Sequence, residues 1–182
     1  AAGGAHSCAI ATAGVVQCWG ANSRGELGDG STALRLSPVN VEGLSSGLVA
    51  IAASDYHSCA LTAAGTVKCW GSNLGGQLGD GSMMARLAPV DVAGSAGIIA
   101  ISARGTFTCA LTAAGGVKCW GNNYYGQLGD GTNTNRSAPG DVTGLSGGVA
   151  AITAGNVHAC ARTSTGAVKC WGTTFGGLIG GS

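Results

Sequence analysis

Residues 57–71 read HSCALTAAGTVKCWG, and this stretch decides the fold of the chain. Two short runs of β-forming side chains flank a break at residues 63–65, which is the pattern of a β-hairpin. The arrangement occurs four times at intervals of about 50 residues, a spacing typical of propellers and solenoids. The copies are marked by Cys8/Cys18 with Trp19-Gly20, Cys59/Cys69 with Trp70-Gly71, Cys109/Cys119 with Trp120-Gly121, and Cys160/Cys170 with Trp171-Gly172.

Each repeat extends on both sides of this hairpin. In the most regular copy an apolar run at 48–52 precedes it, and a glycine-rich turn at 76–81 and a proline-containing segment at 88–92 follow it. Because Gly, Pro, Asn and Asp separate these runs, we predict several short strands per repeat, and we find no helical periodicity. We therefore predict an all-β chain forming a single repeat domain over residues 1–182, with repeat cores at 1–43, 48–94, 98–144 and 149–182.

Composition excludes several classes of protein. Only 9% of the residues are charged, 45% are hydrophobic and 35 are glycine, whereas globular proteins carry about 25% charged residues. This balance favours closely packed sheets with tight turns over disorder. The formal net charge of +1 provides no basic surface for nucleic acid, and no apolar run approaches the roughly 20 residues of a membrane span. We therefore expect no nucleic acid partner and no membrane insertion.

The hairpin register predicts how the cysteines pair. If residues 63–65 form a three-residue loop ending in a left-handed glycine, Leu61 faces Val67 and Cys59 faces Cys69. Directly opposed residues have Cα atoms about 4.5–5.5 Å apart, and a disulfide spans about 4.4–6.8 Å. We therefore predict one disulfide per repeat: Cys8–Cys18, Cys59–Cys69, Cys109–Cys119 and Cys160–Cys170.

Two alternatives to disulfides are considered for the cysteines: zinc ligands and reduced thiols. Zinc ligands usually come in C-x2-C pairs, and the spacing between paired cysteines here is too wide for that. Reduced structural thiols in a cytosolic protein are the remaining alternative. Since disulfides persist in oxidising compartments, we favour an extracellular or cell-surface location, and no cysteine is left over as a catalytic thiol.

The strings HSCALT, GTVKCWG and GQLGDG of residues 57–81 resemble the regulator-of-chromosome-condensation repeat. The resemblance extends over nearly the whole chain in four copies. It implies a β-propeller with four-stranded blades in rings of about seven blades. The bacterial extracellular version with paired cysteines is the most similar form.

The chain departs from that family pattern in the number of its parts. It holds four hairpin cores but only three proline-containing closing segments, at Pro38, Pro89 and Pro139, and the first copy lacks its opening apolar run. The last copy has Leu178 and Gly181 where the others have Gln or Glu and Asp. We therefore expect a ring that is incomplete within this chain, either because the chain is a piece of a longer protein or because partner chains complete it. A self-closed ring of four blades is the less favoured alternative.

The recurring polar residues favour structural roles. His6, His57 and His158 could suggest a metal site, but Phe107 takes the same place in the third copy and cannot be a ligand. We interpret each histidine as capping or bridging strands within its own blade. We interpret the aspartates of the Gly-Asp-Gly turns (Asp29, Asp80 and Asp130) as turn formers, not as calcium ligands. The recurring arginines (Arg35, Arg86 and Arg136) occupy solvated strand positions or pair with a turn aspartate.

No catalytic motif stands apart from the repeats. The chain has no Ser/His/Asp set, paired carboxylates, phosphate loop or dinucleotide fingerprint, so we predict no enzyme activity, no metal and no cofactor. Asn135-Arg136-Ser137 is a single glycosylation sequon, which matters only if the source organism glycosylates proteins.

Positions that differ between copies are free to carry recognition. They cluster before the first cysteine, after the tryptophan (residues 22–24, 73–74, 122–125 and 173–175) and after the Asp-Gly turn. Aromatic and arginine side chains are typical interface anchors, although these could also be ordinary loop residues. The candidate partner-binding residues are Tyr56, Arg104, Phe107, Tyr124, Tyr125 and Phe175.

Three functions follow from this interpretation. We favour a secreted or cell-surface, non-catalytic binding module that recognises a protein or glycan through a propeller face. The alternative is a self-assembling structural protein of an extracellular fibre, sheath or surface layer, in which open strand edges join copies of the chain. A regulator similar to a guanine-nucleotide exchange factor is less favoured, because the predicted disulfides imply a different compartment.

Overall fold

The computed structural model of the chain describes residues 1–11 and 14–173. Within those residues the chain forms β-strands and no α-helix, so the all-β fold class is confirmed. The strands are β1 (His6–Ile10), β2 (Val16–Gly20), β3 (Arg35–Asn40), β4 (Leu48–Ala53), β5 (His57–Thr62), β6 (Val67–Gly71), β7 (Arg86–Asp91), β8 (Ile98–Arg104), β9 (Phe107–Thr112), β10 (Val117–Gly121), β11 (Arg136–Asp141), β12 (Val149–Ala154), β13 (His158–Thr163) and β14 (Val168–Gly172).

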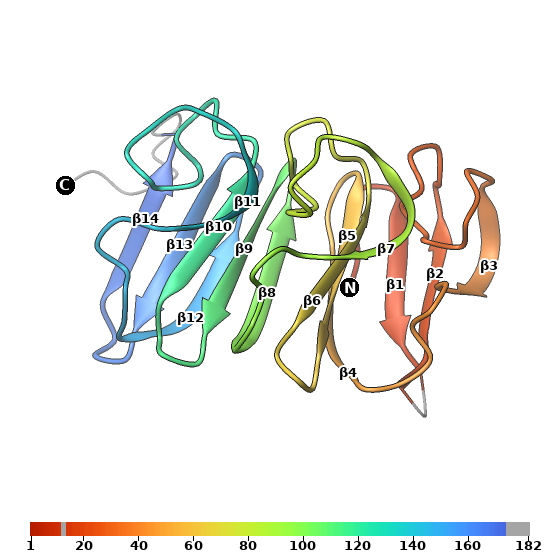
Figure 1. Ribbon diagram of the computed structural model, residues 1–182, viewed down its shortest axis with the longest axis horizontal. Helices are drawn as coiled ribbons and strands as arrows, with labels where there is room; N and C mark the ends of the chain where they lie inside the picture. Colours follow the sequence, from red (N-terminus) through yellow and green to blue (C-terminus); the bar gives the residue numbers. More distant parts are fainter. Residues whose placement is uncertain (12–13, 174–182) are drawn as a thin grey trace.

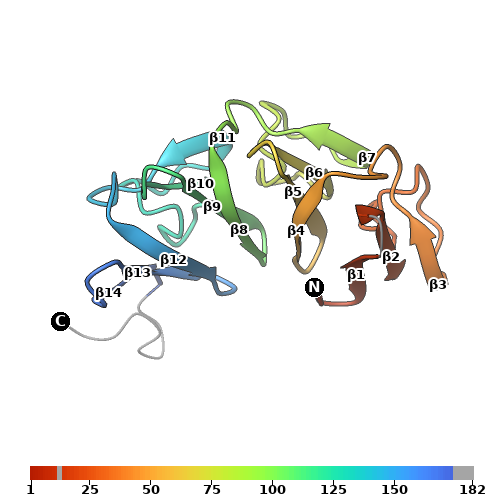
Figure 2. The ribbon, with the colours of Figure 1, turned by 90° about the horizontal axis from the view of Figure 1, so that it is seen from below.

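The strands form four antiparallel sheets, which we call blades 1 to 4. Blade 1 is β1-β2-β3, blade 2 is β4-β5-β6-β7, blade 3 is β8-β9-β10-β11 and blade 4 is β12-β13-β14 (Figure 1). The blades stand side by side in an arc, with β4, β8 and β12 on its inner side and β3, β7 and β11 on its outer side (Figure 2). The arc is open, so the expectation of an incomplete ring is confirmed.

The predicted hairpin register is confirmed. Cys59 pairs with Cys69, Leu61 pairs with Val67, and Gly65 at the end of the loop has φ +76°. The Cα atoms of the two cysteines are 4.1 Å apart, just below the range expected for opposed residues. All four predicted disulfides are present, and no free cysteine remains in the described residues.

The hydrophobic core lies between neighbouring blades. The Cys59–Cys69 disulfide of blade 2 packs in one cluster with Trp120 of blade 3, and equivalent clusters fill the other two junctions. Gly79 approaches this indole so closely that an added Cβ would lie 2.6 Å from Trp120 Nε1. The Gly-Asp-Gly turn therefore needs glycine here for packing as well as for its positive φ of +71°.

The first and last blades differ from the two between them. In blade 1, Ala2 forms an isolated antiparallel bridge to Ser7, where blade 2 has the β4 pair Ala53–Ser58. The first copy therefore retains the end of an inner strand, although it lacks the apolar run. In blade 4 the described residues end after β14, and the divergent turn residues Leu178 and Gly181 lie outside them.

Candidate binding face

The variable segments gather at one end of the blades. His57 pairs with Gly71, so the β4–β5 turn and the β6–β7 loop of blade 2 lie at the same end, and blades 1, 3 and 4 have the same register. This end forms the upper side of the molecule in Figure 1. We call it the loop face and define it by residues 21–34, 54–56, 72–85, 104–106, 122–135 and 155–157.

A buried asparagine organises each long loop of this face. Asn73 accepts a hydrogen bond from the Leu78 amide at 2.9 Å and donates to Asp80 at 3.2 Å. Asp80 in turn accepts a bond from Arg86 Nε at 2.9 Å, and the two also form an ion pair. The same three residues recur in blade 1 as Asn22, Asp29 and Arg35 and in blade 3 as Asn123, Asp130 and Arg136.

These networks confirm one prediction and correct another. Aspartate does pair with arginine in each turn, and the pKa of Asp80 is lowered. Burial alone would raise this pKa, but hydrogen bonds from Ser82 and Arg86 lower it more. Asn73 falls in a segment predicted to vary for recognition, but it is fully buried. Its recurrence three residues after the tryptophan in three copies is the sequence signal for this role.

Large side chains project from this rigid base. Tyr124 is 71% exposed, and its ring meets that of Tyr125 edge to face at 5.0 Å between centroids. Leu74, Met83 and Met84 are exposed on the neighbouring loop of blade 2. The loop face therefore presents aromatic and flexible apolar groups over blades 2 and 3.

Charged and aromatic side chains also connect the blades across this face. The guanidinium of Arg24 in blade 1 lies 4.8 Å from the ring centre of Tyr56 in blade 2. In the next junction, Arg104 Nε of blade 3 lies 3.7 Å from Asp55 Oδ1 of blade 2. Two of the candidate partner-binding residues, Tyr56 and Arg104, are thus exposed, and each contacts a neighbouring blade.

Two other candidates do not join this surface. Phe107 is 0% exposed and packs in the core between blades 3 and 4. The prediction that it contacts a partner is therefore wrong, because the side chain at this register points toward the next blade and not toward solvent. Phe175 lies outside the described residues. Asn135 of the sequon is exposed on the loop face, where its Oδ1 accepts a bond from the Asn123 amide at 2.8 Å.

Comparison with known families identifies the repeat. A family model described as the regulator of chromosome condensation (RCC1) repeat matches residues 13–61, 64–111 and 114–162, which together make up more than half of the chain. The chain belongs to the RCC1 repeat family. A second model of the same description matches residues 48–77 and 98–127. The resemblance found in the hairpin strings is thereby confirmed.

Curated RCC1-type relatives are much longer than this chain. It is 42% identical to the RCC2 homolog of Danio rerio over 90 residues, which are 48% of this chain and 18% of that protein. It is 40% identical to the probable E3 ubiquitin-protein ligase HERC3 of Homo sapiens over 90 residues, 49% of this chain and 9% of that protein. The chain thus spans less than a fifth of the length of these relatives.

Several solved structures share the arrangement of blades. Human WBSCR16 has a TM-score of 0.82 and 26% identity, with 92% of this chain and 45% of that chain covered. Prp20p of Saccharomyces cerevisiae has a TM-score of 0.75 and 22% identity, with 92% of this chain and 43% of that chain covered. The ectodomain of the Physcomitrella patens receptor kinase CR4 has a TM-score of 0.60 and 24% identity, with 98% of this chain and 42% of that chain covered. The last two likenesses concern the fold alone.

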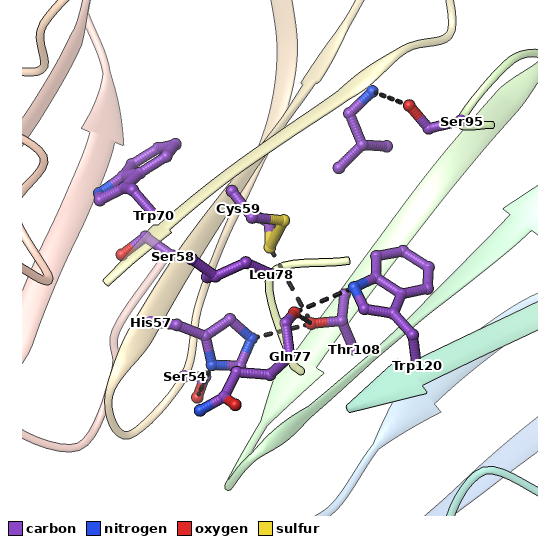
Figure 3. Close-up of a disulfide and its surroundings, with 12 residues drawn as sticks. Ser54, His57, Ser58, Cys59, Trp70, Gln77, Leu78, Ser95, Thr108 and Trp120 are labelled. Carbon is purple, nitrogen blue, oxygen red and sulfur yellow. Dashed lines mark hydrogen bonds between the residues drawn. A yellow bond between two sulfur atoms is a disulfide. The ribbon is translucent and has the colours of Figure 1, made fainter. Parts of the chain in front are cut away.

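The histidines connect successive RCC1-type blades. His57 Nε2 lies 2.8 Å from Thr108 Oγ1 of blade 3, and its Nδ1 lies 3.0 Å from Ser54 Oγ (Figure 3). Burial lowers the pKa of His57 to about 3, with a smaller effect from His6. The prediction that each histidine acts within its own blade holds for Nδ1 of His57 but not for Nε2, because the ring points at the adjoining blade.

The described residues contain no group of three or more His, Cys, Asp or Glu that could hold a metal ion. Nor does any of the described segments form a helix with the length and apolarity needed to cross a membrane.

Proposed function

We propose that this RCC1-type chain is a non-catalytic binding module that recognises a partner through its loop face. The observation that carries this proposal is that the Tyr124–Tyr125 pair of blade 3 and Leu74 and Met84 of blade 2 are exposed on loops fixed by buried asparagines. Aromatic, methionine and arginine side chains are enriched at protein interfaces. A face ordered before binding also loses less conformational entropy when a partner docks.

A protein is the favoured partner, and a glycan is the alternative. Exposed Leu74, Met83 and Met84 on the loop of blade 2 offer apolar surface that a protein side chain can cover. Prp20p shares the fold, and the partners named for its binding, Gsp1p and histones, are proteins. These points support a protein partner for the loop face of this chain.

We place this module in an oxidising compartment, extracellular or at the cell surface. Each of the four blades contains a disulfide, and such bonds persist outside the reducing cytosol. The likeness to a receptor-kinase ectodomain supports the view that this fold serves outside cells.

Substitution of the tyrosine pair tests the binding proposal. Tyr124→Ala/Tyr125→Ala should weaken binding to a protein ligand by about tenfold or more, since interface hot spots cost roughly 2 kcal/mol or more when truncated. Ligands would be sought with an array of purified extracellular proteins and a glycan array, and affinities measured by surface plasmon resonance. Ile99→Ala, which removes an exposed apolar group on β8 away from the loop face, is the matched control.

Equal affinities for the wild-type chain and the tyrosine variant, for every ligand found, would refute the loop face as the binding surface. Loss of glycan binding without loss of any protein binding would select the alternative partner.

A self-assembling structural protein is the second candidate function. The observation that favours it is the exposed apolar surface on the two end blades of the arc, where Leu36 is 90% and Val168 is 66% exposed. Open propeller edges are sites at which chains can join.

A further inference from the structure

Each junction between blades contains one matched pair of side chains. His6 Nε2 lies 2.8 Å from Ser58 Oγ, and His57 Nε2 lies 2.8 Å from Thr108 Oγ1. At the third junction both partners change together: Phe107 replaces the histidine, and Ala159, in the same buried cluster, replaces the hydroxyl. Histidine is thus matched with a hydroxyl, and phenylalanine with a methyl group.

A second contact repeats at every junction. The indole nitrogen of Trp70 donates to the Glu26 carbonyl of the preceding blade at 2.8 Å. Trp120 and Trp171 donate in the same way to Gln77 and Gln127, both at 2.9 Å. Each blade therefore uses one face to offer a hydroxyl or methyl and an indole, and the opposite face to offer a histidine or phenylalanine and a carbonyl.

On blade 4, the face that offers a histidine and a carbonyl meets no neighbouring blade among the described residues. Val168 is 66% exposed, although its equivalents Val67 and Val117 are at most 1% exposed within their junctions. His158 is only partly buried, whereas His57, which meets the next blade, is fully buried. Among the described residues, no hydroxyl of a following blade meets Nε2 of His158.

On blade 1, the face that offers a hydroxyl and an indole meets no neighbouring blade among the described residues. Ser7 and Trp19, which correspond to Ser58 and Trp70, line a hollow of about 250 Å³ together with Gly3, Gly4, Ala5, His6 and Gly20. Neither the hydroxyl of Ser7 nor the indole N–H of Trp19 has a partner among the residues that the structure describes. On the outer strand of this blade Leu36 is 90% exposed, whereas the equivalent Leu87 is 39% exposed because Gly25 of blade 1 packs on it.

We propose that a second copy of this chain docks on these two faces, so that blade 4 of one copy meets blade 1 of the other. The ends have the matching chemistry, because His158 would face Ser7 of the partner subunit, as His6 faces Ser58 within one chain. The expected assembly is a closed pair with two identical junctions related by a twofold axis.

The test is the mass of the oxidised 182-residue chain, measured by light scattering and analytical ultracentrifugation over a range of concentrations. The wild-type chain should form a discrete pair. His158→Phe alone and Ser7→Ala alone should each weaken it, because each leaves a buried polar group unmatched at both junctions. At roughly tenfold per junction, the dissociation constant should rise about 100-fold.

Mixing the two variants is the decisive step. In a mixed pair one junction joins the two substituted side chains, a phenylalanine and an alanine, which is the combination found at Phe107 and Ala159. The other junction joins the unchanged His158 and Ser7. Pairing should therefore return on mixing to within a few-fold of the wild-type strength. Circular dichroism would establish that each variant is folded, and Tyr124→Ala, which affects only the loop face, should leave pairing unchanged.

A wild-type chain that stays a monomer at every concentration would overturn the proposal, and so would a pair that neither single variant weakens. Unlimited growth into long species would overturn the closed pair. None of these results affects the loop-face proposal, which is tested by ligand affinity.

Discussion

At the scale of single residues, the junction histidines show how burial determines both structure and charge. His57 is completely enclosed, and its two ring nitrogens meet the hydroxyls of Ser54 and Thr108. Burial disfavours the charged imidazole because it removes the water that would solvate it, so the pKa of His57 is lowered to about 3. Burial lowers the pKa of His6 as well, against the opposing charges of Glu26 and Asp55.

This shift predicts a pH dependence of stability. Because the pKa of His57 is about 3 in the folded chain and 6.5 in its unperturbed form, the unfolded state binds the proton first as the pH falls. The free energy of unfolding should therefore decrease as the pH falls from 6.5 toward 3, with a slope of up to about 1.4 kcal/mol per pH unit for this residue. Urea titrations between about pH 7 and pH 5 measure this slope, above the range in which aspartates contribute.

The matched control is the double variant His57→Phe/Thr108→Ala, which copies the third junction. Ser54 keeps its bond to the Gly105 carbonyl, and the Gln77 carbonyl keeps the Trp120 indole. The variant should fold and show a shallower slope, with His6 responsible for the part that remains. Identical slopes in the two proteins would contradict this assignment.

At the scale of the hairpin, the disulfide contributes through both chain entropy and packing. A sequence separation of 10 is short, and closing it stabilises the fold by roughly 2–3 kcal/mol in the entropic model. Cys59 and Cys69 are also fully buried between blades 2 and 3, whereas Cys160 and Cys170 are only partly buried on blade 4. The same covalent bond therefore occupies two different environments.

Removing each disulfide should separate these contributions. Both removals are made in the His158→Phe variant, whose weakened pairing leaves blade 4 uncovered. There Cys160→Ala/Cys170→Ala should lower the free energy of unfolding by roughly 2–3 kcal/mol, the entropic part alone. Cys59→Ala/Cys69→Ala should lower it further, because the missing sulfurs also leave a cavity. Urea unfolding under oxidising conditions, monitored by tryptophan fluorescence, gives both values. Equal losses would mean that packing around the buried sulfurs contributes little.

At the scale of the whole molecule, the position of a blade in the arc determines how well it is covered. Blades 2 and 3 have a neighbour on both sides, whereas blade 4 lies at the end of the arc (Figure 2). The disulfide of blade 4 is only partly buried, and Val168 is exposed. Repeat proteins depend on such contacts between neighbours, and an end repeat lacks one of them. Chemical reactivity should therefore differ between blades of nearly identical sequence.

Partial reduction should reveal this difference. In the His158→Phe variant, whose pairing is weakened, dithiothreitol should reduce Cys160–Cys170 first, since it is the most accessible of the four disulfides. Alkylation followed by peptide mass spectrometry identifies the reduced pair. In the wild-type pair, where the second copy covers blade 4, this disulfide should become as resistant as the others. Simultaneous reduction of all four in the variant would argue against an uncovered end blade.

Much of the fold could be predicted from the sequence because the decisive contacts are local. The pairing of Cys59 with Cys69 follows from a three-residue loop with a glycine at its left-handed position. The repetition of this hairpin predicts the blades, and the proline-containing segments predict how three of the repeats close. Tyr56, Tyr124 and Tyr125 were also correctly placed at the surface by their variation between copies.

The sequence alone thus determined the repeat, the hairpin register and the disulfides, since each depends on residues within one short loop. Only the tertiary structure decided which groups meet between blades: His57 with Thr108, Phe107 with the core, and Asn73 with its own loop. The first two of these contacts join residues from different repeats. The alternation within a strand shows which side chains share a face, but the packing of one blade on the next decides which residues that face meets.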